Sequence, residues 1–129
     1  KRQIIYGFIL NMSNTKVIKK IVVEALENLK TQDIVSIDVS QKSNFTDLLI
    51  VCTGTSSTHI KSISDSVIEN LKNNGYSKII RGIEPNNDWI LIDLFDIVIN
   101  IMLSETREFY DLEKLWSLDN SLQPDIKSY

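Results

Sequence analysis

The chain has 129 residues and a formal net charge of −3, and its sequence pI is about 5.1. This length suits one domain with a single core. The acidic balance argues against whole-molecule attraction to nucleic acid, which normally shows as a strongly basic domain. One cysteine and one histidine exclude an internal disulfide and a zinc cluster.

The N-terminus begins with a basic pair followed by a short apolar run, residues 4–10. This run is too short to span a bilayer, which takes about twenty apolar residues. No small-residue cleavage site of a secretory signal follows it. We interpret residues 1–12 as an upstream extension that need not be native, with a natural start at Met12. A packed extra strand and the remnant of an organelle-targeting segment are the alternatives.

Hydrophobic periodicity predicts one domain over residues 13–117, followed by a polar tail over 118–129. Apolar residues recur every three or four positions in the predicted helices and at alternate or consecutive positions in the predicted strands. Hairpins and crossover connections are mixed, which predicts an α/β (α+β) fold: a mixed five-stranded sheet with flanking helices. The elements are a helix over 15–30, strands over 33–39 and 47–53, a helix over 57–73, strands over 77–83, 88–93 and 96–102, and a helix over 106–116.

Capping and turn residues support these boundaries. Ser13 or Asn14 can cap the first helix, and Ser56 or the serine after it can cap the second. Gly54 permits a tight turn before the second helix, and Gly75 can end that helix in a left-handed conformation.

The turn over residues 53–56 is the first candidate for chemistry. It lies between a strand and a helix N-terminus, where backbone N–H groups can hold an anion. It lacks the glycines and lysine of a P-loop, so a plain connection is the favoured interpretation. Cys52 and His59 are the only candidates for a nucleophilic pair. Cys52 ends an apolar strand and is interpreted as an inert core residue, and His59 as a polar or packing contact.

Five aspartates are the remaining candidates for catalysis: Asp38, Asp47, Asp88, Asp93 and Asp96. Metal-dependent nucleotidyl transfer needs two carboxylates on one strand face, two residues apart, so that both reach one metal site. Asp93 and Asp96 are three residues apart across a turn, and Asp38 stands alone on its strand. We therefore interpret these aspartates as hairpin and edge residues.

Trp89 indicates a docking surface. If its strand is extended, Trp89 and Leu91 point one way and Ile90 points the other. Across the hairpin, Asn100 and Met102 can share the face with Trp89. Such a patch would have an apolar centre and an acidic rim, the arrangement of many protein interfaces. The alternative is that Trp89 is a core residue.

Short motifs follow one another along the chain: Asp33-Ile34, Asp38-Val39, Lys42-Ser43, Thr46-Asp47, Thr53-Gly54-Thr55-Ser56, His59, Asp88-Trp89, Asp93-Leu94, Asp96-Ile97-Val98, Arg107-Glu108-Phe109-Tyr110, Leu112-Glu113 and Leu115-Trp116. In order and spacing they resemble the ribosomal silencing factor family, also called Iojap-like, over about residues 17–117. The resemblance implies a fold similar to nucleotidyltransferases, without their catalytic carboxylates. Two positions depart from the family's pattern: Phe95 stands where glycine is usual, and Asn100 where histidine is frequent.

The resemblance also implies a function. A family member binds ribosomal protein fourteen of the large subunit, blocks association with the small subunit and represses translation under nutrient limitation. An acidic protein would meet a basic ribosomal protein with complementary charge. The resemblance makes Trp89 a contact residue, and no catalytic residue, metal or cofactor is expected. The predicted partner-binding residues are Trp89, Ile90, Leu91, Asn100, Met102, Glu108 and Tyr110.

Further expectations concern partners and location. A homodimer is plausible because an exposed hairpin edge can pair with its copy, whereas direct binding to nucleic acid or membrane is not expected. The location implied is the bacterial cytoplasm, or an organellar matrix if the extension is a targeting remnant. Two other functions stay open: a nucleotide-binding or nucleotidyltransferase-type enzyme that uses the Gly54 turn with Asp38 or Asp93, and an interaction module with a different partner.

Overall fold

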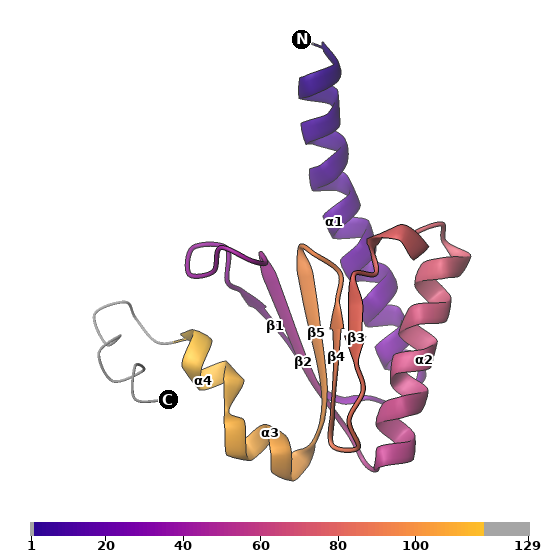
Figure 1. Cartoon of the computed structure of the whole chain (residues 1–129), viewed down its shortest axis with the longest axis vertical. Helices are drawn as coiled ribbons and strands as arrows, with labels where there is room; N and C mark the ends of the chain where they lie inside the picture. Colours follow the sequence, from indigo (N-terminus) through magenta and orange to yellow (C-terminus); the bar gives the residue numbers. More distant parts are fainter. Residues whose placement is uncertain (1, 118–129) are drawn as a thin grey trace.

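The computed structural model describes the backbone of residues 2–117 and the side chains of residues 14–117. Long helices cover one face of a five-stranded sheet, and two short helices lie on the other (Figure 1). This confirms the predicted mixed sheet with flanking helices. The elements are α1 (Arg2–Asn28), β1 (Gln32–Asp38), β2 (Leu48–Gly54), α2 (Ser57–Asn73), the 3-10 helix η1 (Ser77–Ile79), β3 (Gly82–Glu84), β4 (Trp89–Asp93), β5 (Ile97–Leu103), α3 (Ser104–Tyr110) and α4 (Leu112–Ser117).

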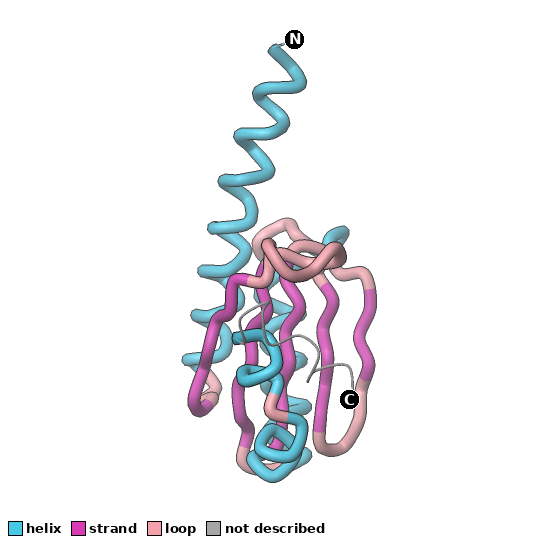
Figure 2. Tube along the Cα trace, turned by 90° about the vertical axis from the view of Figure 1, so that its left-hand side faces the viewer, coloured by secondary structure: helices cyan, strands magenta, loops and turns pink. Residues whose placement is uncertain are grey.

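The strands lie side by side in the order β1-β2-β5-β4-β3 (Figure 2). β2 and β5 are parallel, and the other neighbours are antiparallel. A parallel pair needs a long crossover connection, which here contains α2, β3 and β4. The predicted hairpin of β4 and β5 is confirmed: Trp89 lies opposite Met102, and Asp93 opposite Val98.

We call the face of the sheet that packs against α1 and α2 the inner face, and the opposite face the outer face. The main core lies on the inner face, between the sheet and one apolar stripe of each long helix. Fully burying one such aliphatic side chain contributes about 1.5–3 kcal/mol. Core members include Val22, Leu26, Ile50, Cys52, Ile60, Ile63, Val67, Leu71, Ile90, Ile92, Ile99 and Ile101.

A second, smaller cluster lies on the outer face. Its buried members are Val39, Leu49, Val51 and Met102, and α4 packs on them through Leu112 and Trp116. β2 is therefore buried on both faces, as its consecutive apolar residues predict. Among the described residues, α3 and α4 leave the outer face of β3 and most of β4 uncovered (Figure 2).

Three predicted boundaries are wrong. α1 begins at Arg2 rather than Thr15 and passes residue 12 without a break, because capping residues favour a helix start but do not force one where the preceding chain is also helical. Residues 2–12 are thus not a strand. The third strand is shortened to Gly82–Glu84 because η1 occupies the first part of its predicted range. The last helix is divided into α3 and α4 by Asp111, whose φ of 48° ends α3. The predicted tail, residues 118–129, lies outside the described residues.

The connection from β2 to α2 is held by close packing and by a cap. A Cβ on Gly54 would lie 2.5 Å from Cγ2 of Ile60, so glycine is needed for the approach of α2 to the sheet rather than for a special turn conformation. The Ser56 side chain accepts a hydrogen bond from the backbone N–H of His59, which confirms the predicted cap. Gly75 has a φ of 84° after the end of α2, as predicted.

Candidate protein-docking surface

Trp89 stands at the start of β4, on the outer face. Its indole Nε1 donates a hydrogen bond of 2.9 Å to Oδ1 of Asn100 on the neighbouring strand. Its ring centroid lies 4.9 Å from that of Tyr110 in α3, at an interplanar angle of 53°. The indole is half-buried, and both contacts fix its orientation. Trp89 is thus a rigid aromatic group with part of its surface open to a partner.

Aromatic side chains of α3 extend the surface that Trp89 begins. Tyr110 is 49% exposed and Phe109 is 81% exposed. Their rings meet edge to face, with centroids 5.0 Å apart, an arrangement that adds about 0.5–1.5 kcal/mol beyond burial. Large exposed aromatic groups in contiguous contact are typical of interaction sites. We call Trp89, Leu91, Phe109 and Tyr110 the aromatic patch.

Asp88 ties α3 to the start of β4 and so places the two halves of the aromatic patch together. Its backbone oxygen accepts the N–H of Leu103 at 3.0 Å. Its carboxylate Oδ2 accepts the hydroxyl of Thr106 at 3.1 Å. Asp88 therefore bonds both to the last residue of β5 and to the first turn of α3.

Carboxylates lie near the aromatic patch. Glu84 lies opposite Leu91 across the β3–β4 pair, and with Asn86, Trp89 and Leu91 it lines a hollow of about 240 Å³. Asp93 lies farther along the same face of β4, and Glu108 is exposed on α3. Glu84 and Glu108 thus border the aromatic patch, whereas Asp93 lies at the far end of β4.

Three residues of the predicted contact set are not at this surface. Met102 and Asn100 are buried on the outer face, where Trp89 and the cluster under α4 cover them. Ile90 is buried on the inner face, in the main core. The prediction that Asn100 and Met102 share the face of Trp89 is correct, but their inclusion in an exposed patch is wrong. Asn100 instead holds the Trp89 indole.

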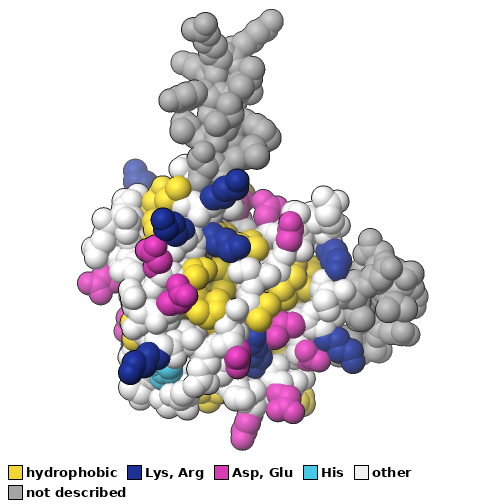
Figure 3. All heavy atoms as spheres, turned by 180° about the vertical axis from the view of Figure 1, so that it is seen from behind, with side chains coloured by type: hydrophobic (Ala, Val, Ile, Leu, Met, Phe, Trp, Pro, Cys, Tyr) yellow, Lys and Arg dark blue, Asp and Glu magenta, His cyan; other side chains and the backbone are white. Residues whose placement is uncertain are grey.

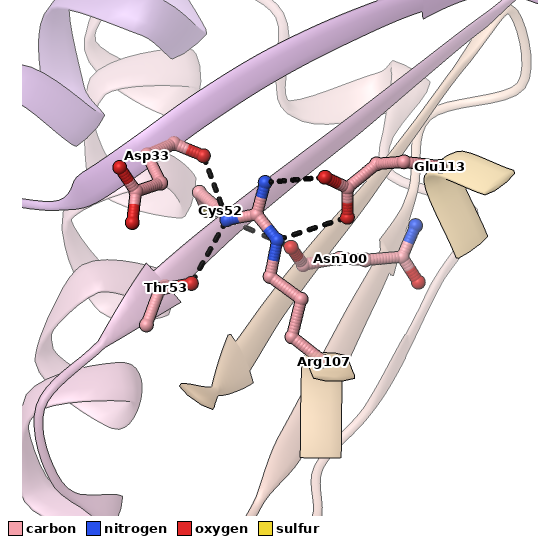
Figure 4. Close-up of polar contacts among 6 residues, drawn as sticks. All are labelled: Asp33, Cys52, Thr53, Asn100, Arg107 and Glu113. Carbon is pink, nitrogen blue, oxygen red and sulfur yellow. Dashed lines mark hydrogen bonds and ion pairs between the residues drawn. The ribbon is translucent and has the colours of Figure 1, made fainter. Parts of the chain in front are cut away.

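A cluster around Arg107 supports the aromatic patch, and the sequence did not predict it (Figure 4). The guanidinium forms a two-point ion pair with Glu113 of α4, at 3.0 and 3.1 Å. Its Nη1 also donates to Oγ1 of Thr53 on β2, at 2.8 Å, and to the backbone oxygen of Asp33 on β1, at 2.7 Å. The Arg107 side chain is only 12% exposed. One side chain thus joins α3, α4, β1 and β2, and so holds the helix that carries Tyr110.

The sequence offers one signal for this cluster. Arg107 is one of two cations between residues 88 and 116, a stretch in which every other charge is acidic. Its partners are far away along the chain, so no local pattern could name them.

Cys52 and His59 each make contacts with other residues and do not form a nucleophilic pair. Burial raises the pKa of the Cys52 thiol to about 12, although the nearby Arg107 charge opposes the shift. The thiol lies 3.6 Å from the backbone oxygen of Asn100. His59 accepts the N–H of Thr55 on Nδ1 and so donates from Nε2 to the backbone oxygen of Leu29, at 2.7 Å. Cys52 is an inert core residue and His59 a packing contact, as predicted.

The helix N-terminus near Gly54 has no phosphate-binding character. The hollow beside it, about 610 Å³, is lined by the carboxylate residues Asp88 and Glu105 and, among the described residues, by no cation. Two N–H groups of this connection are already bonded, that of Thr55 to His59 and that of His59 to Ser56. An anion would also meet the negative charge of Asp88 and Glu105.

Of the five aspartates, Asp47 and Asp96 lie close together, but Asp38 and Asp93 do not. Asp38 is on the edge strand β1, and its hydrogen bonds from Ser40 hold its pKa below the ordinary value. Asp93 is on β4, with β2 and β5 between the two. Within residues 14–117, no group of three or more histidine, cysteine, aspartate or glutamate side chains could hold a metal ion. The described helices also include none that is long and apolar enough to cross a membrane.

The fold and this surface together have the features of a binding domain: a rigid sheet that presents aromatic groups with carboxylates beside them. The family model "Ribosomal silencing factor during starvation" matches residues 12–128. The chain therefore belongs to the ribosomal silencing factor family, a family of ribosome-associated regulatory factors.

Individual relatives agree with this assignment. The chain is 42% identical over 94 residues to "Ribosomal silencing factor RsfS" of Haemophilus influenzae, which covers 73% of this chain and 92% of that protein. It is 35% identical over 101 residues to "Mitochondrial assembly of ribosomal large subunit protein 1" of Mus musculus, covering 74% of this chain and 43% of the mouse protein. A crystal structure of a Chromobacterium violaceum protein superimposes with a TM-score of 0.74 at 35% identity, over 81% of this chain and 88% of that one.

Proposed function

We propose that this protein binds ribosomal protein fourteen on the large ribosomal subunit through the aromatic patch. Bound there, it blocks association with the small subunit and represses translation when nutrients are limiting. The observation that carries this proposal is the contact between the Trp89 and Tyr110 rings. Both rings are partly exposed, although the neighbouring Met102 on the same face of the sheet is buried.

The geometry of Trp89 supports tight binding. A side chain that is already held in place loses little conformational freedom when a partner covers it, so more of the burial energy appears as affinity. The hydrogen bond to Asn100 and the contact with Tyr110 provide this restraint. Tryptophan and tyrosine at the centre of an interface are the residues that most often dominate its binding energy.

Acidic residues support the choice of a basic partner. Glu84 and Glu108 lie beside the aromatic patch. Ribosomal proteins are basic, and rim charges of opposite sign mainly raise the association rate and select the partner. Because these charges are at the surface, salt should slow association more than it speeds dissociation.

Steric exclusion is the mechanism we propose for silencing. A domain of this size bound at the subunit-joining face leaves no room for the small subunit there, and no bond chemistry is needed. Asp38 and Asp93, which the alternative enzyme would use, lie on strands separated by two others, and the Cys52 thiol is buried.

The test is co-sedimentation with purified large subunits. We expect Trp89→Ala to weaken binding by about 2 kcal/mol or more, about thirtyfold in Kd, and to permit subunit joining that the unaltered protein prevents. Phe45→Ala is the matched control, because Phe45 is 90% exposed in the β1–β2 loop and outside the aromatic patch. Binding by the Trp89 variant at unaltered strength would refute the proposal, provided that circular dichroism shows both variants folded.

Two further expectations remain proposals. We also propose self-association through the exposed edge strand β3, since β3 pairs only with β4 among the described strands. The relatives include a bacterial protein and a mouse protein that is named as mitochondrial. We therefore propose a location in a bacterial cytoplasm or in an organellar matrix.

A further inference from the structure

A second pocket lies at the opposite end of the sheet from the aromatic patch. α3 begins where β5 ends, whereas this pocket adjoins the turn that precedes β5 (Figure 1). It has a volume of about 470 Å³ and lies between α1, η1 and the β4–β5 turn. Pockets of this size accommodate small organic groups. Neither the family assignment nor the proposed docking to ribosomal protein fourteen uses it.

The floor of the pocket is apolar and its rim is polar. Ile18, Leu94 and Ile97 line it and are buried. Lys78 and Arg81 also line it and are exposed, so their charged ends stand at the mouth. An apolar cavity bordered by cations suits a ligand with a flat, weakly polar part and an anionic part.

Phe95 forms one edge of the pocket in an unfavourable backbone conformation. Its φ is 79°, which costs a residue with a Cβ about 1–2 kcal/mol. The turn enforces this conformation, since the Phe95 N–H bonds to Oδ1 of Asp93 and the Leu94 N–H to the oxygen of Ile97. Despite that cost the ring is 55% exposed. A large aromatic residue held open in a strained turn suggests a function for the ring itself.

The Arg81 guanidinium already occupies one face of this ring. Its central carbon lies 4.6 Å from the ring centroid of Phe95. The pair therefore offers both an aromatic face and a planar cation for stacking, and Arg81 can move aside on an exposed side chain. Proteins bind unpaired nucleobases with this combination.

Basic residues continue from the pocket along α1. Thr15 and Ile18 line the pocket, and the exposed lysines of the same helix segment are Lys16, Lys19 and Lys20. Figure 3 shows lysine or arginine side chains at this end of the molecule, with hydrophobic and acidic side chains among them. Five cations therefore lie at this end of the molecule, together with the carboxylates of Asp93 and Asp96.

One carboxylate also lines the pocket. Asp96 is half-buried there; burial and the nearby Asp47 raise its pKa, while a hydrogen bond with Thr15 opposes the shift. A phosphate would avoid this group, but the exocyclic amino group of a base such as cytosine would donate to it. The base is thus expected inside and the phosphates outside.

We propose that this pocket binds an unpaired nucleotide of single-stranded RNA. The base stacks on Phe95 over the apolar floor, and the flanking phosphates contact Lys78, Arg81 and the lysines of α1. A strand fits better than a free nucleotide because the cations are spread along a helix rather than gathered around one phosphate. Because the family is ribosome-associated, we expect the single-stranded RNA to be a segment of ribosomal RNA.

The test is fluorescence anisotropy of the free protein with a labelled, unstructured cytosine-rich RNA of about eight nucleotides. We expect Phe95→Gly to weaken binding about tenfold, the loss typical of one stacked base, without lowering Tm because glycine accepts the positive φ. The double variant Lys78→Gln with Arg81→Gln should reduce the slope of log K against log salt concentration by about 1.4, since each single-strand phosphate contact contributes about 0.7.

Matched controls separate the pocket from the rest of the surface. Phe45→Ala removes a still more exposed phenylalanine outside the pocket, and Trp89→Ala removes the centre of the aromatic patch. Both should bind the RNA as the unaltered protein does, so failure of the RNA site and failure of the docking proposal are distinguishable. Unchanged binding by Phe95→Gly, an equal loss in Phe45→Ala, or equal affinity for a duplex or a single mononucleotide would overturn the inference.

Discussion

The two faces of β4 differ although their residues alternate along one strand. Ile90 and Ile92 are buried against α1 and α2, whereas Trp89 and Leu91 on the outer face remain half-exposed. The strand is the same, so the difference lies in what covers it: two long helices on the inner face, and short helices displaced toward β1 and β2 on the outer. Exposure on β4 is thus a consequence of where α3 and α4 lie.

The outer face is open but not loosely built. Asn100 holds the Trp89 indole, and Arg107 joins two helices to two strands. The inner face obtains its rigidity from close apolar packing, whereas the outer face obtains it from directed polar contacts. This permits an apolar surface to remain ordered while uncovered.

The largest predicted effect is a difference in stability between alanine variants of two neighbouring residues of β4. Ile92→Ala should lower the free energy of unfolding by about 2–4 kcal/mol, because it leaves a cavity in the main core. Leu91→Ala should lower it by less than about 1 kcal/mol, yet weaken binding to large subunits. Denaturant unfolding with co-sedimentation measures both. Equal loss of stability in the two variants would show that the faces do not differ as described.

The Arg107 cluster gives the next largest effect. Arg107→Ala should lower the free energy of unfolding by about 2–3 kcal/mol, because it leaves Glu113 and Thr53 without their partner in a partly buried site. Arg107→Lys should not restore it, since an ammonium cannot form the planar two-point contact.

Lys114 provides the control for that experiment, as an exposed cation on α4. Lys114→Ala should change stability by less than about 0.5 kcal/mol. If the two alanine variants are equally stable, the outer face does not depend on its polar contacts.

Part of this architecture was predictable because it is local. The alternation in β4, the register of the hairpin and the Ser56 cap follow from nearest neighbours and from period-two patterning. Phe95 was also recognisable as a departure from the family pattern, which usually has glycine there. Its φ of 79° is the left-handed backbone conformation that glycine adopts more easily.

The rest depends on contacts between distant parts of the chain. Met102 and Asn100 are buried because Trp89 and α4 cover that part of the sheet, and no pattern within β5 reveals this. The partners of Arg107 lie up to 74 residues away. Helix α1 is longer than predicted because capping preferences of about 1 kcal/mol do not decide a helix start alone.

The last prediction concerns Cys52, on the inner face, and is an effect of pH. Its folded pKa is raised to about 12 from 9.0, so its contribution to stability is complete below pH 9 and is lost as pH rises toward 12. Above pH 9 stability should fall by up to about 1.4 kcal/mol per pH unit from this group, and Cys52→Ala should remove that part of the slope. Rapid alkylation of the folded thiol at pH 8, at the rate seen in guanidinium, would show that the inner face admits solvent.

The contact that we propose between the aromatic patch and ribosomal protein fourteen can be tested directly. The most direct measurement replaces Tyr110 with a photoreactive phenylalanine analogue, irradiates the complex with large subunits and identifies the cross-linked protein by mass spectrometry. We predict that ribosomal protein fourteen is the main product, and that the same analogue in place of Phe45 gives none of it. Cross-linking of position 110 to a different ribosomal protein, or of position 45 to ribosomal protein fourteen in equal yield, would contradict the proposed contact.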